Sequence, residues 1–141
     1  MIDLPTDLPA DLVPLSWLRG VWEGSGVIDY AVGDTTLRGE FTHRVSFSHD
    51  GTDALTYSAI AWLTGDGQGE NFDEGDPRRV PLVSEAGFWR LSRPLGDADA
   101  GPGLLPATAP APARTVDDVE ALRTSEDGFE VEASIVHSDG V

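Results

Sequence analysis

The side chains able to carry out chemistry are few in this sequence. It holds three histidines, His43, His49 and His137, but no cysteine, and all nine basic residues are arginines. The lack of cysteine excludes thiol nucleophiles, iron–sulfur clusters and cysteine-ligated zinc, and the lack of lysine excludes Schiff-base chemistry. His49 and His137 stand beside turn signals, so we expect both imidazoles to be exposed. His43 shares the parity of neighbouring apolar residues, so we expect it to point inward and to hydrogen-bond a neighbour.

Two further candidate sites do not fit the patterns that their chemistry requires. Ser25 lies between two glycines, but Glu23 occupies the position where a G-x-S-x-G nucleophile elbow needs glycine. Residues 65–79 are rich in glycine and carboxylates, but their spacing does not match a calcium-binding loop. We therefore expect a solvated acidic loop there, and neither a catalytic residue nor a metal site in the chain.

Charged residues on the expected strands offer ion pairs more readily than chemistry. Glu85 stands on an otherwise apolar strand, and parity places Arg90 on its opposite face. Glu23 could pair with Arg38 or Arg44 on the neighbouring strand. An exposed pair of this kind contributes about 0–1 kcal/mol and indicates no activity.

Length and charge restrict the class of protein. The 141 residues and 15.0 kDa favour one domain, 1–141, and 16 glycines with 10 prolines favour short elements joined by turns. A net charge of -16 repels phosphate backbones and anionic headgroups, so neither nucleic acid nor a membrane is expected as a partner. The first residues have no export signal, and we expect a cytoplasmic protein.

Alternation of apolar and polar residues predicts six strands that follow one another up and down. The first places Trp22, Gly24 and Gly26 on one face and ends at a turn at residues 33–34. The next two form a hairpin around Asp50-Gly51. The predicted strands after the first are residues 40–49, 55–64, 80–93, 116–124 and 129–137.

The remaining segments are predicted to lie outside the sheet. Residues 1–13 form a lead-in, and Leu12 to Leu18 could make at most two helical turns with Asp11 as the N-cap. Residues 65–79 and 94–114 are loop inserts, and the second, rich in proline and alanine, is expected to be disordered. A meander of this size usually closes into an antiparallel up-and-down β-barrel. Because the sequence stops after a turn signal, we expect an open sheet edge and self-association through it.

The motif Gly20-x-Trp22-x-Gly24-x-Gly26 resembles the GxWxGxG signature of the nitrobindins, a family of fatty-acid-binding-protein-like β-barrels. Further segments follow in the order found in that family, and the resemblance covers most of residues 14–141. These segments are Phe47-Ser48-His49-Asp50-Gly51, Leu55-Thr56-Tyr57, Ser84-Glu85-Ala86-Gly87-Phe88-Trp89-Arg90 and Val136-His137-Ser138-Asp139-Gly140-Val141.

The resemblance implies a lipocalin-like barrel of ten strands that holds ferric haem and acts on nitric oxide or peroxynitrite. It places the proximal histidine near the C-terminus of the family and a distal histidine at the position of Val83. This all-β chain is therefore expected to be incomplete at its C-terminus, with about six of the ten strands. Tyr30 and Tyr57 remain as conceivable iron ligands.

With both family histidines missing, we expect no cofactor in this chain and no enzymatic activity. The alternatives are a non-enzymatic barrel that binds another small apolar ligand, and a half-barrel completed by a partner. For the motif itself, we expect Trp22 to plug one end of the core. Its glycines are expected to let strands cross closely, and contact of Gly20, Trp22, Gly24 and Gly26 with a bound ligand is the second interpretation.

Overall fold

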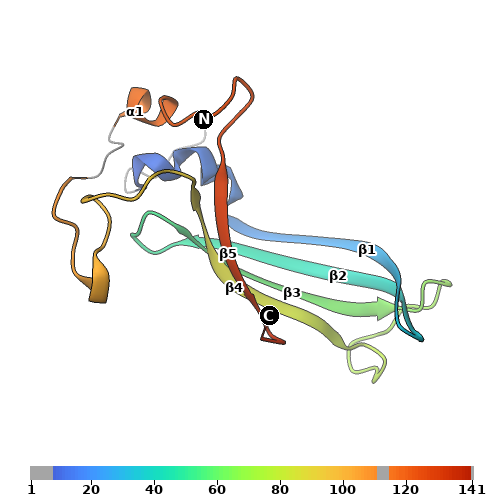
Figure 1. Ribbon diagram of the computed structural model, residues 1–141. Coiled ribbons are helices and arrows are strands. Elements are labelled where there is room, and N and C mark those ends of the chain that lie inside the picture. Colours follow the sequence, from blue (N-terminus) through green and yellow to red (C-terminus); the bar gives the residue numbers. More distant parts are fainter. Residues whose placement is uncertain (1–7, 111–114, 141) are drawn as a thin grey trace. The chain divides into compact units, whose positions relative to one another are not determined.

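Five antiparallel strands form one sheet in the order β1-β2-β3-β4-β5 in the computed structural model, which describes residues 8–110 and 115–140 (Figure 1). This confirms the predicted all-β fold with consecutive strands side by side. The strands are β1 (Gly20–Val32), β2 (Thr35–His49), β3 (Leu55–Gly65), β4 (Pro81–Leu91) and β5 (Val131–His137).

The β1–β2 hairpin is paired along the whole length of its first strand. Its pairs run from Gly20 opposite Phe47 to Val32 opposite Thr35, so a two-residue turn joins the strands. Gly33 begins that turn with a φ of 60°, a left-handed conformation that costs glycine little. The predicted turn at residues 33–34 is confirmed.

Alternating burial along β3 identifies the side of the sheet that carries the core. Tyr57, Ala59 and Ala61 are buried on one face, while the side chains between them are half-buried or exposed. Phe47 of β2 is buried on the same face, with its ring centroid 5.2 Å from that of Tyr57. We call this side the inner face.

The fifth predicted strand, residues 116–124, is wrong because this segment contains the short helix α1 (Val116–Glu120). Thr115 starts the helix through a capping box. Its hydroxyl accepts a hydrogen bond from the Asp118 backbone N–H, and the Asp118 carboxylate accepts one from the Thr115 backbone N–H. These reciprocal bonds satisfy the first backbone N–H donors of the helix. The stabilisation that they give exceeds the preference of the two nearby valines for a strand.

The lead-in contains the 3-10 helix η1 (Ala10–Leu18), which buries Leu12 and Leu15. The prediction that Asp11 caps a helix is wrong, since Pro9 occupies the cap position and Asp11 lies inside the helix with a buried side chain. Proline fixes φ near the helical range and therefore suits a helix start. Residues 1–7 of the predicted lead-in lie outside the described residues.

Residues 66–80 form the predicted acidic loop, in which Arg78 hydrogen-bonds Glu70 and Asp76. In the part of the chain that the structure describes, no group of three or more histidine, aspartate or glutamate side chains could hold a metal ion. No helix among these residues is long and apolar enough to cross a membrane.

The second insert is more ordered than predicted between residues 96 and 109. The Thr108 backbone N–H donates to the Asp97 carbonyl at 2.8 Å, and Pro102–Leu104 form a second 3-10 helix, η2. These backbone bonds give the proline-rich segment a defined path that its composition does not reveal. Residues 111–114 of this insert lie outside the described range.

The chain divides into two compact units. Among the described residues, the first comprises 8–19, 49–55, 89–110 and 115–133, and the second comprises 20–48, 56–88 and 134–140.

Candidate functional site

The four motif residues lie at alternate positions of β1 in the second unit, so they share one face of that strand. Directly opposite residues of paired strands share a face, and the partners of the motif on β2 include the buried Phe47. The motif therefore belongs to the inner face. The pairs are Gly20 with Phe47, Trp22 with Val45, Gly24 with His43, and Gly26 with Phe41.

The motif glycines have different surroundings. A Cβ atom on Gly26 would lie 2.9 Å from the Phe41 ring, so this glycine allows the close approach predicted from the sequence. A Cβ atom on Gly24 would meet nothing within 4 Å. Gly24 thus leaves open space on the inner face beside His43, where another side chain would stand.

Trp22 does not plug the core, contrary to the prediction, because 49% of its surface is exposed. Its position is on the inner face, but β1 is the outermost strand in the sheet order, so it has a neighbouring strand on one side only among the described residues. An indole left half-exposed on an apolar face is available to pack against a ligand.

Small apolar side chains occupy several inner-face positions on the strands beyond Gly24. Ala59 and Ala61 are buried on β3, Val45 is half-buried on β2, and Val83 is half-buried on β4. No long side chain rises from these positions. We call these inner-face positions the cradle, defined by Gly24, Val45, Ala59, Ala61 and Val83.

A polar row borders the cradle on the inner face. The Tyr57 hydroxyl donates a hydrogen bond to Oε2 of Glu85 at 2.7 Å, and Oε1 of Glu85 lies 3.0 Å from Nε2 of His137. The Phe47 ring packs against the Tyr57 ring. We call Tyr57, Glu85 and His137 the inner-face row; they come from β3, β4 and β5.

Burial controls the protonation of Tyr57 in this row. Loss of solvent around the phenol, together with its hydrogen bond to the Glu85 carboxylate, raises the pKa of Tyr57 to about 12. The phenol is therefore neutral at physiological pH and donates its proton to Glu85. This protonation state does not suit Tyr57 as a tyrosinate ligand for iron, and Tyr30 is largely exposed on β1.

The three histidines differ in their surroundings. His43 is half-buried on the inner face, as predicted, but among the described residues no hydrogen bond to a neighbour is found for its ring. His49 is half-buried, with Nε2 3.0 Å from the Thr52 carbonyl oxygen. His137 is half-buried in the inner-face row. His49 and His137 are thus half-buried rather than fully exposed, and each ring lies beside an acceptor.

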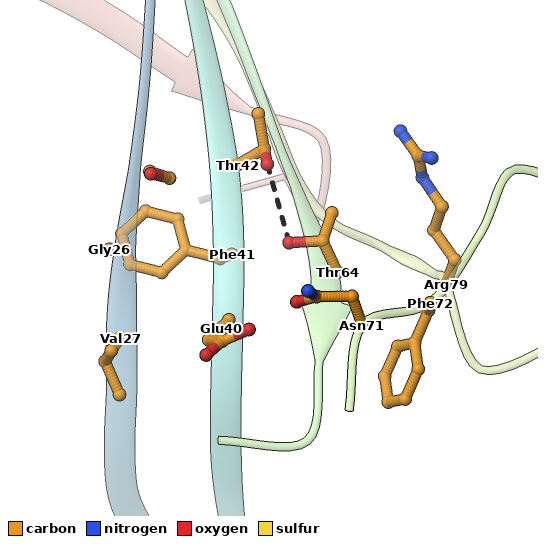
Figure 2. Close-up of a pocket in the computed structure, with 10 residues that line it drawn as sticks. Gly26, Val27, Glu40, Phe41, Thr42, Thr64, Asn71, Phe72 and Arg79 are labelled. Atoms are coloured by element: carbon orange, nitrogen blue, oxygen red, sulfur yellow. Dashed lines mark hydrogen bonds between the residues drawn. The ribbon is translucent and has the colours of Figure 1, made fainter. Parts of the chain in front are cut away.

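A pocket of about 490 Å³ lies between the middle of β1 and β2, the end of β3 and the acidic loop (Figure 2). Thr42 and Thr64 meet in it through their hydroxyl oxygens, 3.4 Å apart. Its lining offers neither histidine nor an activated nucleophile, so this arrangement does not suggest catalysis. The lining residues are Ser25, Gly26, Val27, Glu40, Phe41, Thr42, Thr64, Asn71, Phe72 and Arg79.

The first unit contains a cluster of ion pairs around Arg93, whose side chain is only 6% exposed. Its guanidinium donates to both carboxylate oxygens of Asp99, at 2.7 and 3.0 Å, and to Asp53 at 3.0 Å. Nε donates to Asp11 at 3.4 Å. The cluster joins η1, the β2–β3 turn and the segment after β4, and we interpret it as structural.

The predicted surface ion pairs are partly confirmed. Arg44 pairs with Glu23 at 3.2 Å, whereas Arg38 pairs with Asp29 instead, at 3.7 Å. Both pairs are exposed. They stabilise the β1–β2 hairpin weakly and contribute nothing to the inner face.

Comparison with known proteins gives one family and a consistent set of relatives. Residues 11–141 match the family described as "THAP4-like, heme-binding beta-barrel domain". The chain is 55% identical over its whole length to a protein named peroxynitrite isomerase from Leifsonia xyli subsp. xyli, of which it covers 66%. It is 53% identical to the protein of the same name from Clavibacter michiganensis subsp. michiganensis, with 100% of the chain and 66% of that relative covered. In Pseudarthrobacter chlorophenolicus, the corresponding identity is 46%, over 99% of the chain and 64% of the relative.

These findings correct the expectation that no cofactor belongs to this chain, because the matching family is described as heme-binding. That expectation rested on a count of iron donors within the sequence. The chain spans just under two thirds of the length of these relatives. The possible iron ligands counted in this sequence are therefore not all those that a full-length relative has.

Proposed function

Since the chain belongs to the family of THAP4-like, heme-binding β-barrel domains, we propose that its inner face forms one wall of a haem site that isomerises peroxynitrite. The family match supports the cofactor, and the name of the relatives, peroxynitrite isomerase, supports the reaction. The observation that carries the proposal in this chain is the cradle beside Trp22.

The cradle fits a flat apolar group. Gly24 leaves space above the sheet, and the small side chains of Ala59 and Ala61 keep the surface low on the neighbouring strand. Trp22 offers a half-exposed aromatic surface beside them. Sites for large cofactors are mostly lined by apolar and aromatic side chains with few polar groups, as this face is.

Among the described histidines, His43 has the best position to approach a group on the cradle. It lies opposite Gly24, whereas Nε2 of His49 and of His137 already faces an acceptor. The resemblance implies a proximal histidine near the C-terminus of the family, and we assign that role to none of these three. We assign to His43 a polar contact at the edge of the bound group.

When bound, haem supplies an iron centre that accepts small nitrogen–oxygen ligands. The chain's own part is to hold that group by apolar contact and to exclude water from it. Isomerisation of peroxynitrite to nitrate exchanges an O–O bond for an N–O bond and transfers no net electrons. The reaction therefore needs orientation and control of charge from the protein rather than a reductant.

Haem titration of the chain tests this function. We expect a saturable Soret band in the wild type, and faster conversion of peroxynitrite to nitrate by the loaded protein in stopped-flow absorbance. Gly24→Phe fills the cradle and should weaken haem binding at least tenfold. Ser25→Phe, on the opposite face of the same strand, is the matched control and should bind haem as the wild type does. Equal binding by the two variants would contradict the assignment of the cradle.

A second candidate is a sheet completed by a partner chain, which we propose from the exposure of β1. Eleven of its thirteen positions are exposed, and its edge is not covered by another strand among the described residues. An open edge offers backbone donors and acceptors to a second copy. Light scattering tests this: a concentration-independent monomer would reject the candidate, and a dimer lost on Val27→Pro would support it.

A further inference from the structure

We propose that Tyr57, Glu85 and His137 form the proton outlet of the haem site, with Glu85 as the group that accepts the proton and His137 as the group that delivers it to solvent. This inference rests on the proposed function. It assigns to the inner-face row a part in the reaction of peroxynitrous acid, the neutral form of the substrate.

The position of the row connects it to the cradle. Along β3, Ala59 of the cradle stands two residues from Tyr57, and along β4, Val83 stands two residues from Glu85. Residues two apart share a face of a strand and lie about 7 Å apart. The row is therefore the ionisable border nearest to the cradle on these two strands.

Exposure increases along the row from its inner end to its outer end. Tyr57 is 6% exposed, and the His137 side chain at the other end is 39% exposed. Glu85 stands between them, with one carboxylate oxygen directed to each neighbour. A proton accepted by Glu85 thus has a hydrogen-bonded path of one step to an imidazole that reaches solvent.

The charge of the protein favours the neutral substrate over its anion. A net charge of -16 produces a negative potential that disfavours the approach of an anion. Glu85 adds a carboxylate on the inner face itself, and among the described residues no arginine pairs with it. Peroxynitrous acid carries no charge and meets neither barrier.

The reaction balances with Glu85 as acceptor. In peroxynitrous acid the O–O bond breaks and an N–O bond forms, which gives nitrate and one proton with no net change in electrons. The proton passes to the Glu85 carboxylate and then to Nε2 of His137, whose ring carries its own proton on Nδ1 for this step and releases that Nδ1 proton to water. Tyr57 keeps its own proton and holds Glu85 in place, so it is a positioning residue.

The ionisable groups around the row are few, which makes its behaviour testable. Glu85 faces His137 from the neighbouring strand β4, Tyr57 lies one strand further away on β3, and Asp139 follows His137 in the turn after β5. His43 is the other ionisable group near the centre of the inner face, on β2. Arg90 and Glu132 pair with each other at even-numbered positions of β4 and β5, so they lie on the face opposite to Glu85 and His137.

The decisive variant is Glu85→Gln, which keeps the size of the side chain and removes the proton acceptor. Its matched control is Glu23→Gln, which removes the same charge from the exposed face of β1. We expect both variants to bind haem within threefold of the wild type. We expect isomerisation at neutral pH to fall at least tenfold in Glu85→Gln and to remain unchanged in Glu23→Gln. Equal rates in the two variants would overturn the inference while leaving the proposed function intact.

A second readout needs no haem. Tyr57 and Tyr30 are the two tyrosines of the chain, so ultraviolet titration of the haem-free protein reports both phenols. Removal of the Glu85 carboxylate should move the Tyr57 titration from about 12 toward 10, and Glu23→Gln should not move it. An unchanged Tyr57 titration in Glu85→Gln would show that Tyr57 and Glu85 are not coupled.

Two outcomes separate the inference from the function on which it rests. If the wild type neither takes up haem nor isomerises peroxynitrite, the proposed function fails, and the inference fails with it whatever the titration gives. If Glu85→Gln does not fold, Glu85→Asp replaces it, because the shorter carboxylate keeps the charge but cannot span both contacts. A tenfold loss in Glu85→Asp with haem binding retained would support the inference, and full activity would overturn it.

Discussion

Asp99→Asn tests whether the Arg93 cluster stabilises the first unit through charge. Asp99 holds the guanidinium with both carboxylate oxygens and also accepts a hydrogen bond from the Gly96 backbone N–H at 2.8 Å. The asparagine side chain has nearly the same size but no charge and one acceptor oxygen. The substitution therefore removes the ion pair without creating a cavity.

The size of the effect follows from the pKa of Asp99. The hydrogen bonds from Arg93, opposed by partial burial, lower this pKa from 3.8 to about 2. A shift of this size corresponds to about 2 kcal/mol of stability, at about 1.4 kcal/mol per pKa unit. Because the folded pKa is depressed, this stability is present above pH 3.8 and is lost as the pH falls toward 2. At pH 3, roughly half of it should remain.

Urea denaturation at pH 7 and at pH 3 measures this contribution. We expect Asp99→Asn to lower the free energy of unfolding by about 2 kcal/mol at pH 7 and by about half as much at pH 3. Asp97→Asn, an exposed neighbour in the same loop, is the charge-matched control and should change little. Burial raises the pKa of Asp11, so Asp11→Asn should be less costly at pH 7 than Asp99→Asn. A loss in Asp99→Asn that does not depend on pH would refute this reasoning.

Two further predictions concern the sheet. Gly87→Ala should destabilise the protein by about 2 kcal/mol or more in urea denaturation, since the new Cβ atom would overlap the Ser134 carbonyl oxygen. Gly24→Ala is the control and should be nearly neutral, because its Cβ atom would meet nothing within 4 Å. Equal stability of the two variants would contradict the close approach of β4 and β5. Trp22→Ala should lower the free energy of unfolding by less than the roughly 3–5 kcal/mol lost with a buried tryptophan, because the side chain is half-exposed. The same variant should weaken haem binding measurably in the haem titration. Unchanged haem binding would remove Trp22 from the site.

The strands could be predicted because their signals are local. Alternation along residues 40–49 and 55–64 repeats at every second position, and a glycine-containing turn joins each of the first two pairs of strands. β2 extends five residues further toward its start than predicted, because Thr35 and its neighbours pair with the end of β1. Such pairing depends on the partner strand and leaves little trace in the paired segment itself.

The polar sites could be predicted only in part because their partners are distant in sequence. Arg93 lies 82 positions from Asp11, so no local pattern connects them. Glu85 did carry a signal, as a carboxylate on an otherwise apolar strand, but its partners Tyr57 and His137 come from other strands. The turn beside His137 predicts an exposed imidazole but gives no sign of its partner Glu85, which the pairing of β4 with β5 supplies.

The route by which β5 reaches β4 has a consequence for the order of folding. Two residues connect β1 to β2, whereas residues 92–130 separate β4 from β5. Closing the longer connection costs about 2–3 kcal/mol more chain entropy than a short one. The β1–β2 hairpin should therefore form early and β5 should dock last, so the contact between Glu85 and His137 is completed at the end of folding. By the same reasoning, it is among the first contacts to open when the native sheet fluctuates.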